Sequence, residues 1–204
     1  FWNFMKKAED KITANILDYF LNRPKMHQRK YVLSKNSSCP RSNGIYAWYF
    51  KDGLFKLPNQ KSISRHKNYS ILYIGIAPSR LTSKSNIRKR IFNHFRGTAY
   101  GSTLRLSLGV LLSNKSKFIL RRIKNKKMIR FTDEGEDWID NWLEKNSLVS
   151  WFENPQPWKI EKNLINQLYL PLNIQGNLNN AFKSTLIDLR KKARERAMNL
   201  AIID

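Results

Sequence analysis

Two short runs of aromatic and β-branched residues constrain the fold of this chain more than any other feature. The first, NGIYAWYF, contains Gly44-Ile45-Tyr46, and the second, YSILYIGIAP, contains Tyr73-Ile74-Gly75. Residues of these types fit the pleated, half-buried surface of a strand. The sequence therefore predicts one strand over residues 44–50 and a second over residues 70–76. Either triplet alone says little about function, because such residues occur in many strands.

The charge balance indicates a polyanionic partner. The 204 residues include 38 Lys and Arg against 15 Asp and Glu, a formal net charge of +23, which creates a strongly positive field. The basic residues are interleaved with aromatic residues along the chain and are not concentrated beside an apolar helix. This distribution favours nucleic acid over an acidic membrane surface. No run of the ~18 to 20 apolar residues that a membrane-spanning helix needs is present, so we expect no membrane partner.

Cysteine usage indicates a reducing compartment. Cys39 is the only cysteine, which excludes a disulfide within the chain, and one cysteine with three histidines cannot build a Cys-rich zinc site. The start of the chain, FWNFMKKAEDKI, lacks the apolar core of a secretory signal. These features predict a soluble, cytoplasmic protein. Residue 1 is Phe and not Met, which is consistent with a processed product or a piece of a longer protein.

The chain divides into an N-terminal extension and a main domain. Apolar residues at helical spacing predict a helix over residues 2–21, and a basic, turn-rich loop follows it. Residues 1–42 are therefore an N-terminal helix and basic loop, and residues 43–204 form the main domain. Within that domain, residues 51–68 are an insertion longer than a hairpin needs. It is either a surface excursion or, because it carries Lys56 and Arg65, a segment that clamps or reads nucleic acid.

The segment SNIRKRIFNHFRG predicts a helix that begins after Ser85 or Asn86 and ends at Gly97. Arg90 and His94 are four residues apart, so they share one face of it, at the edge of its buried stripe. Further helices are predicted over YGSTLRLSLGVLL, where Arg105 could face a substrate, over DEGEDWIDNWLEKN, between Pro157 and Pro171, and over FKSTLIDLRKKARERAMNLAII. LVSWF reads as a third strand, and KFILRRIKNKKMIRF as a basic hairpin with its turn around Lys124 to Lys126.

The two triplets are followed, in order, by Arg90, His94, Glu161 and Asn173. With IRKRIFNHFRG, YGSTLRLSLG and PLNIQGN, this constellation resembles the GIY-YIG nuclease family, in particular its stand-alone bacterial, restriction-endonuclease-like members. The resemblance covers the chain from about residue 43 to residue 196. It implies an α+β fold in which a small three-stranded antiparallel sheet is flanked by helices, here with N-terminal and C-terminal helical extensions. The interval between the two triplets is longer than in compact members.

The resemblance also implies roles for the six residues. Tyr46 would be the general base, with a phenolate favoured by Arg90, a metal and the positive field, and His94 would help by accepting its proton. Tyr73 would position water or phosphate, Arg90 would clamp the transition state, and Asn173 would hold the geometry. Glu161 would bind one Mg²⁺, for which Mn²⁺ could substitute, because hard divalent cations prefer oxygen ligands. Candidate nucleic-acid contacts are Arg88, Arg96, Arg105, Lys56 and Arg65.

We therefore expect a Mg²⁺-dependent DNA endonuclease that serves restriction or another defence against foreign DNA, as a homodimer on DNA or within a larger defence protein or complex. Two alternatives stay open. One is a structure-specific or nonspecific nuclease, acting on DNA or RNA. The other is a nucleic-acid-binding module whose site is idle or depends on a partner. Metal dependence separates the enzyme from the binding module, whereas salt dependence does not, because both bind a polyanion.

Overall fold

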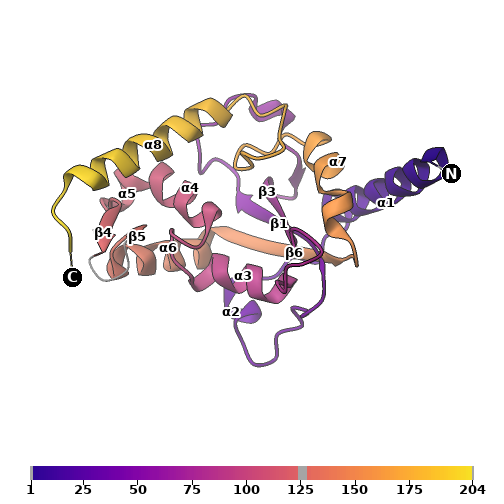
Figure 1. Cartoon of the computed structure of the whole chain (residues 1–204), viewed down its shortest axis with the longest axis horizontal. Coiled ribbons are helices and arrows are strands. Elements are labelled where there is room, and N and C mark those ends of the chain that lie inside the picture. The colour runs from indigo at the N-terminus through magenta and orange to yellow at the C-terminus, as the bar shows by residue number, and fades with distance from the viewer. Residues whose placement is uncertain (1, 124–127, 204) are drawn as a thin grey trace.

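An antiparallel sheet lies at the centre of the computed structural model, which describes residues 2–123 and 128–203 (Figure 1). Its strands run in the order β2-β3-β1-β6. They are β1 (Gly44–Lys51), β2 (Arg65–His66), β3 (Tyr69–Ala77) and β6 (Ser147–Glu153). The helices are α1 (Trp2–Asn22), α2 (Arg29–Val32), α3 (Ile87–Arg96), α4 (Thr103–Leu111), α5 (Ser113–Ser116), α6 (Asp133–Asn146), α7 (Glu161–Asn166) and α8 (Lys183–Asn199). Short 3-10 turns are η1 (Gln60–Ser62) and η3 (Pro157–Lys159).

The sheet has one strand more than the sequence predicts. β3, β1 and β6 are the three predicted strands, and the α+β class and both helical extensions are confirmed. The fourth strand, β2, comes from the insertion: Arg65 and His66 pair with Ser70 and Tyr69 of β3. Two residues carry no periodicity that a sequence pattern could reveal. The three-stranded prediction is therefore corrected to four strands.

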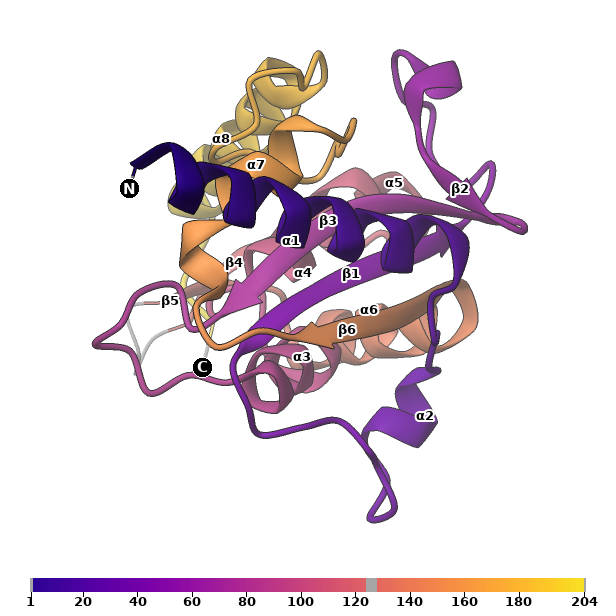
Figure 2. The same cartoon turned by 90° about the vertical axis from the view of Figure 1, so that its right-hand side faces the viewer.

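The central strand β1 is buried on both faces. Ile45, Ala47 and Tyr49 face α1 and α7, while Tyr46, Trp48 and Phe50 face the layer of α3, α4 and α6. Figure 2 shows α1 crossing one face of the sheet, with α3 and α6 behind it. Alternate residues of a strand point to opposite faces, so a strand covered on both sides is apolar throughout. Tyr46 therefore points into the helical layer that carries His94.

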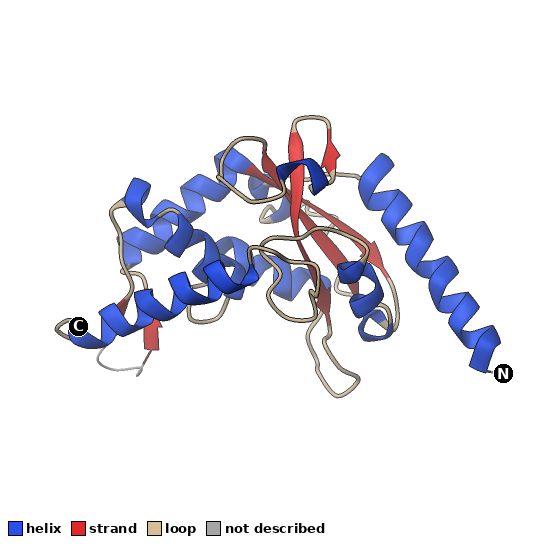
Figure 3. Ribbon diagram, turned by 90° about the horizontal axis from the view of Figure 1, so that it is seen from above, coloured by secondary structure: helices blue, strands red, loops and turns tan. Residues whose placement is uncertain are grey.

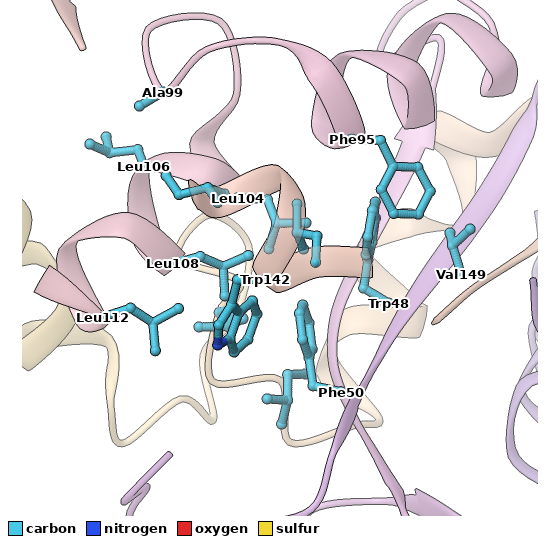
Figure 4. Packing of buried hydrophobic residues seen from close by; sticks show 14 of the residues in the cluster. Trp48, Phe50, Phe95, Ala99, Leu104, Leu106, Leu108, Leu112, Trp142 and Val149 are labelled. Atoms are coloured by element: carbon cyan, nitrogen blue, oxygen red, sulfur yellow. The ribbon is translucent and has the colours of Figure 1, made fainter. Parts of the chain in front are cut away.

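The larger of two hydrophobic cores lies between the sheet and this helical layer (Figure 4). Trp48 packs edge-on against Phe95 of α3, with ring centroids 4.6 Å apart. Phe50 lies 6.0 Å from the Trp142 ring of α6. Tilted and edge-on aromatic pairs contribute beyond the area they bury. This core fixes α3, and with it His94 and Arg90, against β1.

Side-chain caps set the starts of the helices that carry the site. Asn86 accepts a hydrogen bond from the Lys89 amide, 2.9 Å away, at the start of α3. Ser102 accepts from the Arg105 amide at the start of α4, at 3.2 Å. Such caps satisfy amides that have no partner within the helix. The Asn86 cap confirms the start predicted from the sequence.

The two terminal helices lie at opposite ends of the long axis (Figures 1 and 3). α1 packs on the sheet face that carries Ile45, Ala47 and Tyr49, and α8 packs along α4. A short helix, α2, lies within the loop predicted after α1, and the helix predicted from Pro157 is shorter than expected: η3 precedes α7, which ends at Asn166. Among the described residues, no helix is long and apolar enough to cross a membrane.

The predicted basic hairpin is present as β4 (Arg121–Ile123) and β5 (Met128–Arg130), which pair antiparallel. Its turn, predicted around Lys124 to Lys126, lies outside the described residues. Ile123 also forms a parallel bridge with Ile203. The hairpin and the end of the chain are thereby joined beside α8.

Candidate active site

Close packing requires glycine at both motif positions, Gly44 and Gly75. A Cβ atom on Gly75 would overlap the Tyr46 ring and hydroxyl, because the ring lies across the neighbouring strand at that position. A Cβ atom on Gly44 would overlap the Phe152 carbonyl oxygen of β6 and lie 2.6 Å from the Ile87 side chain. Glycine is the residue that permits such approaches. Gly75 thus makes room for the Tyr46 ring, and Gly44 allows β1 to approach β6 and α3 closely.

Tyr46 is the first member of a buried hydrogen-bonded chain. Its hydroxyl lies 2.9 Å from Nε2 of His94, and Nδ1 of His94 lies 2.7 Å from the Ser102 hydroxyl. Both ring residues are 0 % exposed. Burial, followed by the charges of Arg90 and Arg105, holds the pKa of His94 well below its usual value. His94 is therefore neutral at physiological pH, and its surroundings disfavour the protonated ring.

Arg90 acts on the two motif tyrosines. Burial and then the nearby Tyr73 hydroxyl raise the pKa of Tyr46, whereas the charge of Arg90 and a hydrogen bond from it act in the opposite direction. Burial is the largest cause, so the pKa of Tyr46 lies above its usual value in the protein alone. The family resemblance implied that the positive surroundings would favour the Tyr46 phenolate. Desolvation instead outweighs Arg90 here, because the hydroxyl has no exposed surface.

Tyr73 and Glu161 meet at a cavity of about 510 Å³. Thr103, Asn173 and residues of α8 also line it. The Tyr73 hydroxyl interacts with Thr103, Tyr46 and Arg90, and the charge of Glu161 raises the pKa of both tyrosines. These mutual effects place Tyr46 of β1 and Arg90 of α3 close to Tyr73 and Glu161, and the latter two line the cavity. A cavity of this volume lies within the usual range of ligand-binding pockets.

Glu161 carries the carboxylate of the site. It is the first residue of α7 and is partly buried, and burial raises its pKa. Within the described part of the chain, its side chain has no hydrogen bond or ion pair, and no three His, Cys, Asp or Glu side chains gather into a metal-binding group. A partly buried carboxylate without a partner is costly unless a cation joins it. Glu161 thus offers a site for a cation bound by a single protein carboxylate.

Asn173 fastens the second triplet to the loop after α7. Its Oδ1 accepts from the Ile74 amide at 2.9 Å, and its Nδ2 donates to the Ile74 carbonyl at 2.7 Å. Asn180 in turn donates to the carbonyl of Asn173 at 2.8 Å. A two-bond clasp fixes orientation as well as distance. This geometry supports the positioning role proposed for Asn173, because the clasp holds the backbone between Tyr73 and Gly75.

The comparisons with known proteins agree with this geometry. A family model described as "GIY-YIG catalytic domain" matches residues 44–192, which is most of the chain. The chain belongs to the GIY-YIG nuclease family. Searches of curated proteins and of solved structures gave no match. The match begins at Gly44, the first motif residue, and ends within α8. The GIY-YIG domain identifies the protein as a nuclease, a phosphodiester hydrolase.

Arg105, which was expected to contact nucleic acid, has a structural role in this GIY-YIG domain. Its side chain is 0 % exposed and is held by Glu136 at 2.8 Å and by Asp140 at 2.5 Å. Glu136 also accepts from the Ala99 amide, and Asp140 pairs with Arg29 of α2. A buried, doubly paired guanidinium cannot reach a nucleic acid. The predicted nucleic-acid contact is therefore corrected to a structural ion-pair network that joins α4, α6 and α2.

The other predicted nucleic-acid contacts of the GIY-YIG domain lie away from the cavity. Arg88 and Arg96 both lie over the Phe92 ring, at 5.0 and 5.2 Å, on the side of α3 opposite Arg90. Arg65 donates to the Gln60 carbonyl, and Lys56 is exposed on the insertion. Their contact with nucleic acid remains a proposal.

Sequence reasoning missed four residues of this GIY-YIG site: Ser102, Thr103, Arg190 and Arg194. Ser102 binds His94, and the other three line the cavity. The capping position of Ser102 in YGSTLRLSLG was a signal that could have drawn attention to it. The two arginines carried no such signal, because a basic residue on an amphipathic helix is usually a solvated charge.

Proposed function

We propose that this GIY-YIG protein is a divalent-metal-dependent DNA endonuclease. The observation that carries the proposal is that the buried Tyr46–His94 pair and Arg90 lie next to Tyr73 and Glu161, which line one cavity, and that Glu161 has no ion-pair partner among the described residues. Phosphodiester hydrolysis needs an activated water, charge neutralisation and stabilisation of the leaving oxygen. Each requirement has a candidate group in this arrangement.

The donor set fits a hard cation of the Mg²⁺ type. Glu161 would hold it as a single carboxylate, and substrate phosphate would supply a further oxygen ligand; Mn²⁺ could replace Mg²⁺. When bound, the cation would neutralise charge on the phosphoryl group and stabilise the leaving oxygen. The lack of any other partner for Glu161 within the described residues supports this assignment.

The protein side chains supply the proton path. We assign Tyr46 as the base that removes a proton from the attacking water and His94 as the group that accepts the proton of the Tyr46 hydroxyl. The two are already hydrogen-bonded, and the neutral tautomer of His94 with its lone pair on Nε2 would be the acceptor, although burial lowers the pKa of the ring and opposes the transfer. Arg90, which is always charged, would stabilise the phosphoryl oxygens with two hydrogen bonds. Tyr73 would orient the phosphate or the water from the neighbouring strand.

The biological role rests on the resemblance to restriction-endonuclease-like members of the family. We propose a role in restriction or another defence against foreign DNA, in the cytoplasm, with the chain acting alone or within a larger protein or complex. The site has one set of catalytic residues per chain. Cleavage of both strands therefore requires a homodimer on DNA or two sequential nicks.

The test compares Glu161→Gln with the matched control Glu134→Gln on supercoiled plasmid, with Mg²⁺ or with EDTA. Glu134 is exposed at the start of α6 and makes the same chemical change away from the cavity. We expect cleavage by the wild type and by the control in Mg²⁺ only, and a loss of at least ~100-fold in Glu161→Gln. Mg²⁺ should also raise the melting temperature of the wild type but not that of Glu161→Gln.

Two outcomes would contradict the proposal. Metal-dependent cleavage by Glu161→Gln would remove the metal assignment, and an active Tyr46→Phe enzyme would remove Tyr46 as the base. A gel shift without cutting under all metal conditions would favour the binding module. Discrete fragments would indicate sequence specificity, whereas a smear would indicate a nonspecific nuclease.

A further inference from the structure

One face of the C-terminal helix α8 forms a wall of the active-site cavity. Ile187, Arg190, Lys191, Arg194 and Met198 all line it. Their spacing of three and four residues places them on a single stripe of the helix. Glu161, Tyr73 and Asn173 line the same cavity from α7, β3 and the loop before α8. The wall therefore faces the groups assigned to catalysis, although it lies far from most of them in the sequence.

This wall carries three basic side chains and one carboxylate, Glu195, which also lines the cavity. Lys191 has a partner in Glu195, with Nζ and Oε1 3.9 Å apart. Arg190 is partly buried, and among residues 2–123 and 128–203 no carboxylate or carbonyl binds its side chain. Burial and the neighbouring charge of Arg194 lower the pKa of Arg190. Two adjacent guanidinium groups, one of them partly desolvated, form an arrangement that an anion would stabilise.

From this geometry we infer that Arg190, supported by Arg194, binds a phosphate of the substrate strand next to the phosphodiester that is cleaved. Arg90 already reaches the Tyr46 hydroxyl and is the cation assigned to the cleaved phosphodiester. Arg190 comes from α8 and lines the cavity, where its charge acts on Tyr73, so we assign it to a neighbouring phosphate. Ile187 and Met198, 41 % and 52 % exposed at either end of the stripe, would lie against sugars or bases. The inference rests on the proposed function in that it takes the ligand to be nucleic acid.

The opposite face of α8 provides a matched control. Leu189, Lys192, Ala193 and Arg196 line a separate cavity of about 200 Å³ beside α4 and β5. Arg196→Gln removes the same charge from the same helix as Arg190→Gln, but from the side that faces away from Glu161. The two variants therefore alter the long-range field of the protein to a similar extent. They differ in whether a cation is removed from the active-site cavity.

The experiment measures the affinity for a fluorescein-labelled DNA duplex over a series of NaCl concentrations, in EDTA. Each variant is made both in the wild type and in Glu161→Gln. We expect Arg190→Gln to weaken binding about 10-fold more than Arg196→Gln does, and to reduce the slope of log affinity against log salt by about 1. Arg190→Lys should restore the slope, because it keeps the charge, but only part of the affinity. A merely structural role for Arg190 would not change the salt slope.

Equal slopes and affinities for Arg190→Gln and Arg196→Gln would overturn the inference. If Arg190→Gln fails to fold in a melting experiment, Arg194→Gln, which is exposed, takes its place with the same expected result. Binding in EDTA does not depend on cleavage, so the proposed phosphate contact of Arg190 and the proposed catalytic function can each be contradicted without the other. A wild type that never cuts DNA but shows the Arg190 effect would contradict only the catalytic proposal. A wild type that cuts DNA and lacks the effect would contradict only the phosphate contact.

Discussion

His94 shows how one residue joins the chemistry of the site to the stability of the fold. It has no exposed surface, and its two ring nitrogens are bound to Tyr46 and Ser102. Because burial lowers its pKa, protonation of His94 is easier in the unfolded chain than in the native protein. The unfolded state therefore takes up a proton first as the pH falls.

This difference predicts a loss of stability in mild acid. As the pH falls below about 6.5, His94 becomes protonated in the unfolded chain but stays neutral in the native protein, so the free energy of unfolding decreases. The free energy of unfolding in urea is measured at several values between about pH 7.5 and about pH 5.5, a range that brackets the ordinary pKa of histidine. It should decrease with falling pH in the wild type and decrease less in His94→Gln. His66→Gln serves as the control, since His66 binds only the Leu21 carbonyl.

His27 and Glu161 also contribute to the pH dependence of the free energy of unfolding, and comparison of the wild type with His94→Gln separates their contributions from that of His94. Burial also lowers the pKa of His27, so His27 contributes with the same sign as His94. Burial raises the pKa of Glu161, so its contribution is present at low pH and is lost as the pH rises above about 4.5. An identical pH dependence in the wild type and His94→Gln would show that His94 is not the group responsible.

At the scale of elements, the insertion between β1 and β3 is part of the fold and not only a surface excursion. Leu57 and Ile63 are 8 % and 6 % exposed and belong to the larger core, and Arg65 and His66 supply strand β2. Lys51, at the far end of β1, lies five residues from Tyr46, which corresponds to about 17 Å along a strand. A contact of the insertion with nucleic acid would therefore lie well away from the Tyr46 hydroxyl.

Truncating a buried side chain of the insertion should reduce stability. We expect Leu57→Ala to cost about 2 to 3 kcal/mol, because it removes buried methyl groups and leaves a cavity. The neighbouring change Lys56→Gln should cost less than ~0.5 kcal/mol, since Lys56 is exposed. The free energy of unfolding in urea measures both. A Leu57→Ala protein as stable as Lys56→Gln would show that the insertion contributes nothing to the core.

At the scale of the whole molecule, a net charge of +23 is carried by side chains that are mostly exposed. The buried ion pairs of Arg105 with Glu136 and Asp140 show that part of the positive charge is structural. The remainder forms a field that would attract a polyanion and release counterions when it binds.

We therefore predict that binding to DNA of unrelated sequence weakens steeply with salt. If six or more phosphates are neutralised, the affinity should fall about 10³-fold between ~50 and ~200 mM salt. Fluorescence anisotropy in EDTA measures this without cleavage. A slope close to zero would mean that the excess charge does not contact the DNA backbone.

The local pattern of the sequence was sufficient for most elements. Aromatic and β-branched runs predicted β1, β3 and β6, and apolar spacing with caps predicted α1, α3, α6 and α8. These signals are local, because they depend on period and on the residues at the ends of each element. The family was likewise identified from the order of six residues, and the match over residues 44–192 agrees with it.

The sequence by itself determined most of the longer elements and the family to which the chain belongs. Only the tertiary structure decided which charges are buried and paired and which face the cavity. Arg105 and Arg190 are both basic residues on helices, yet one is enclosed by two carboxylates and the other lines the site without an anionic partner among the described residues. Their environments depend on contacts between elements far apart in the chain, and the balance between desolvation and pairing in those contacts has no local sequence signature.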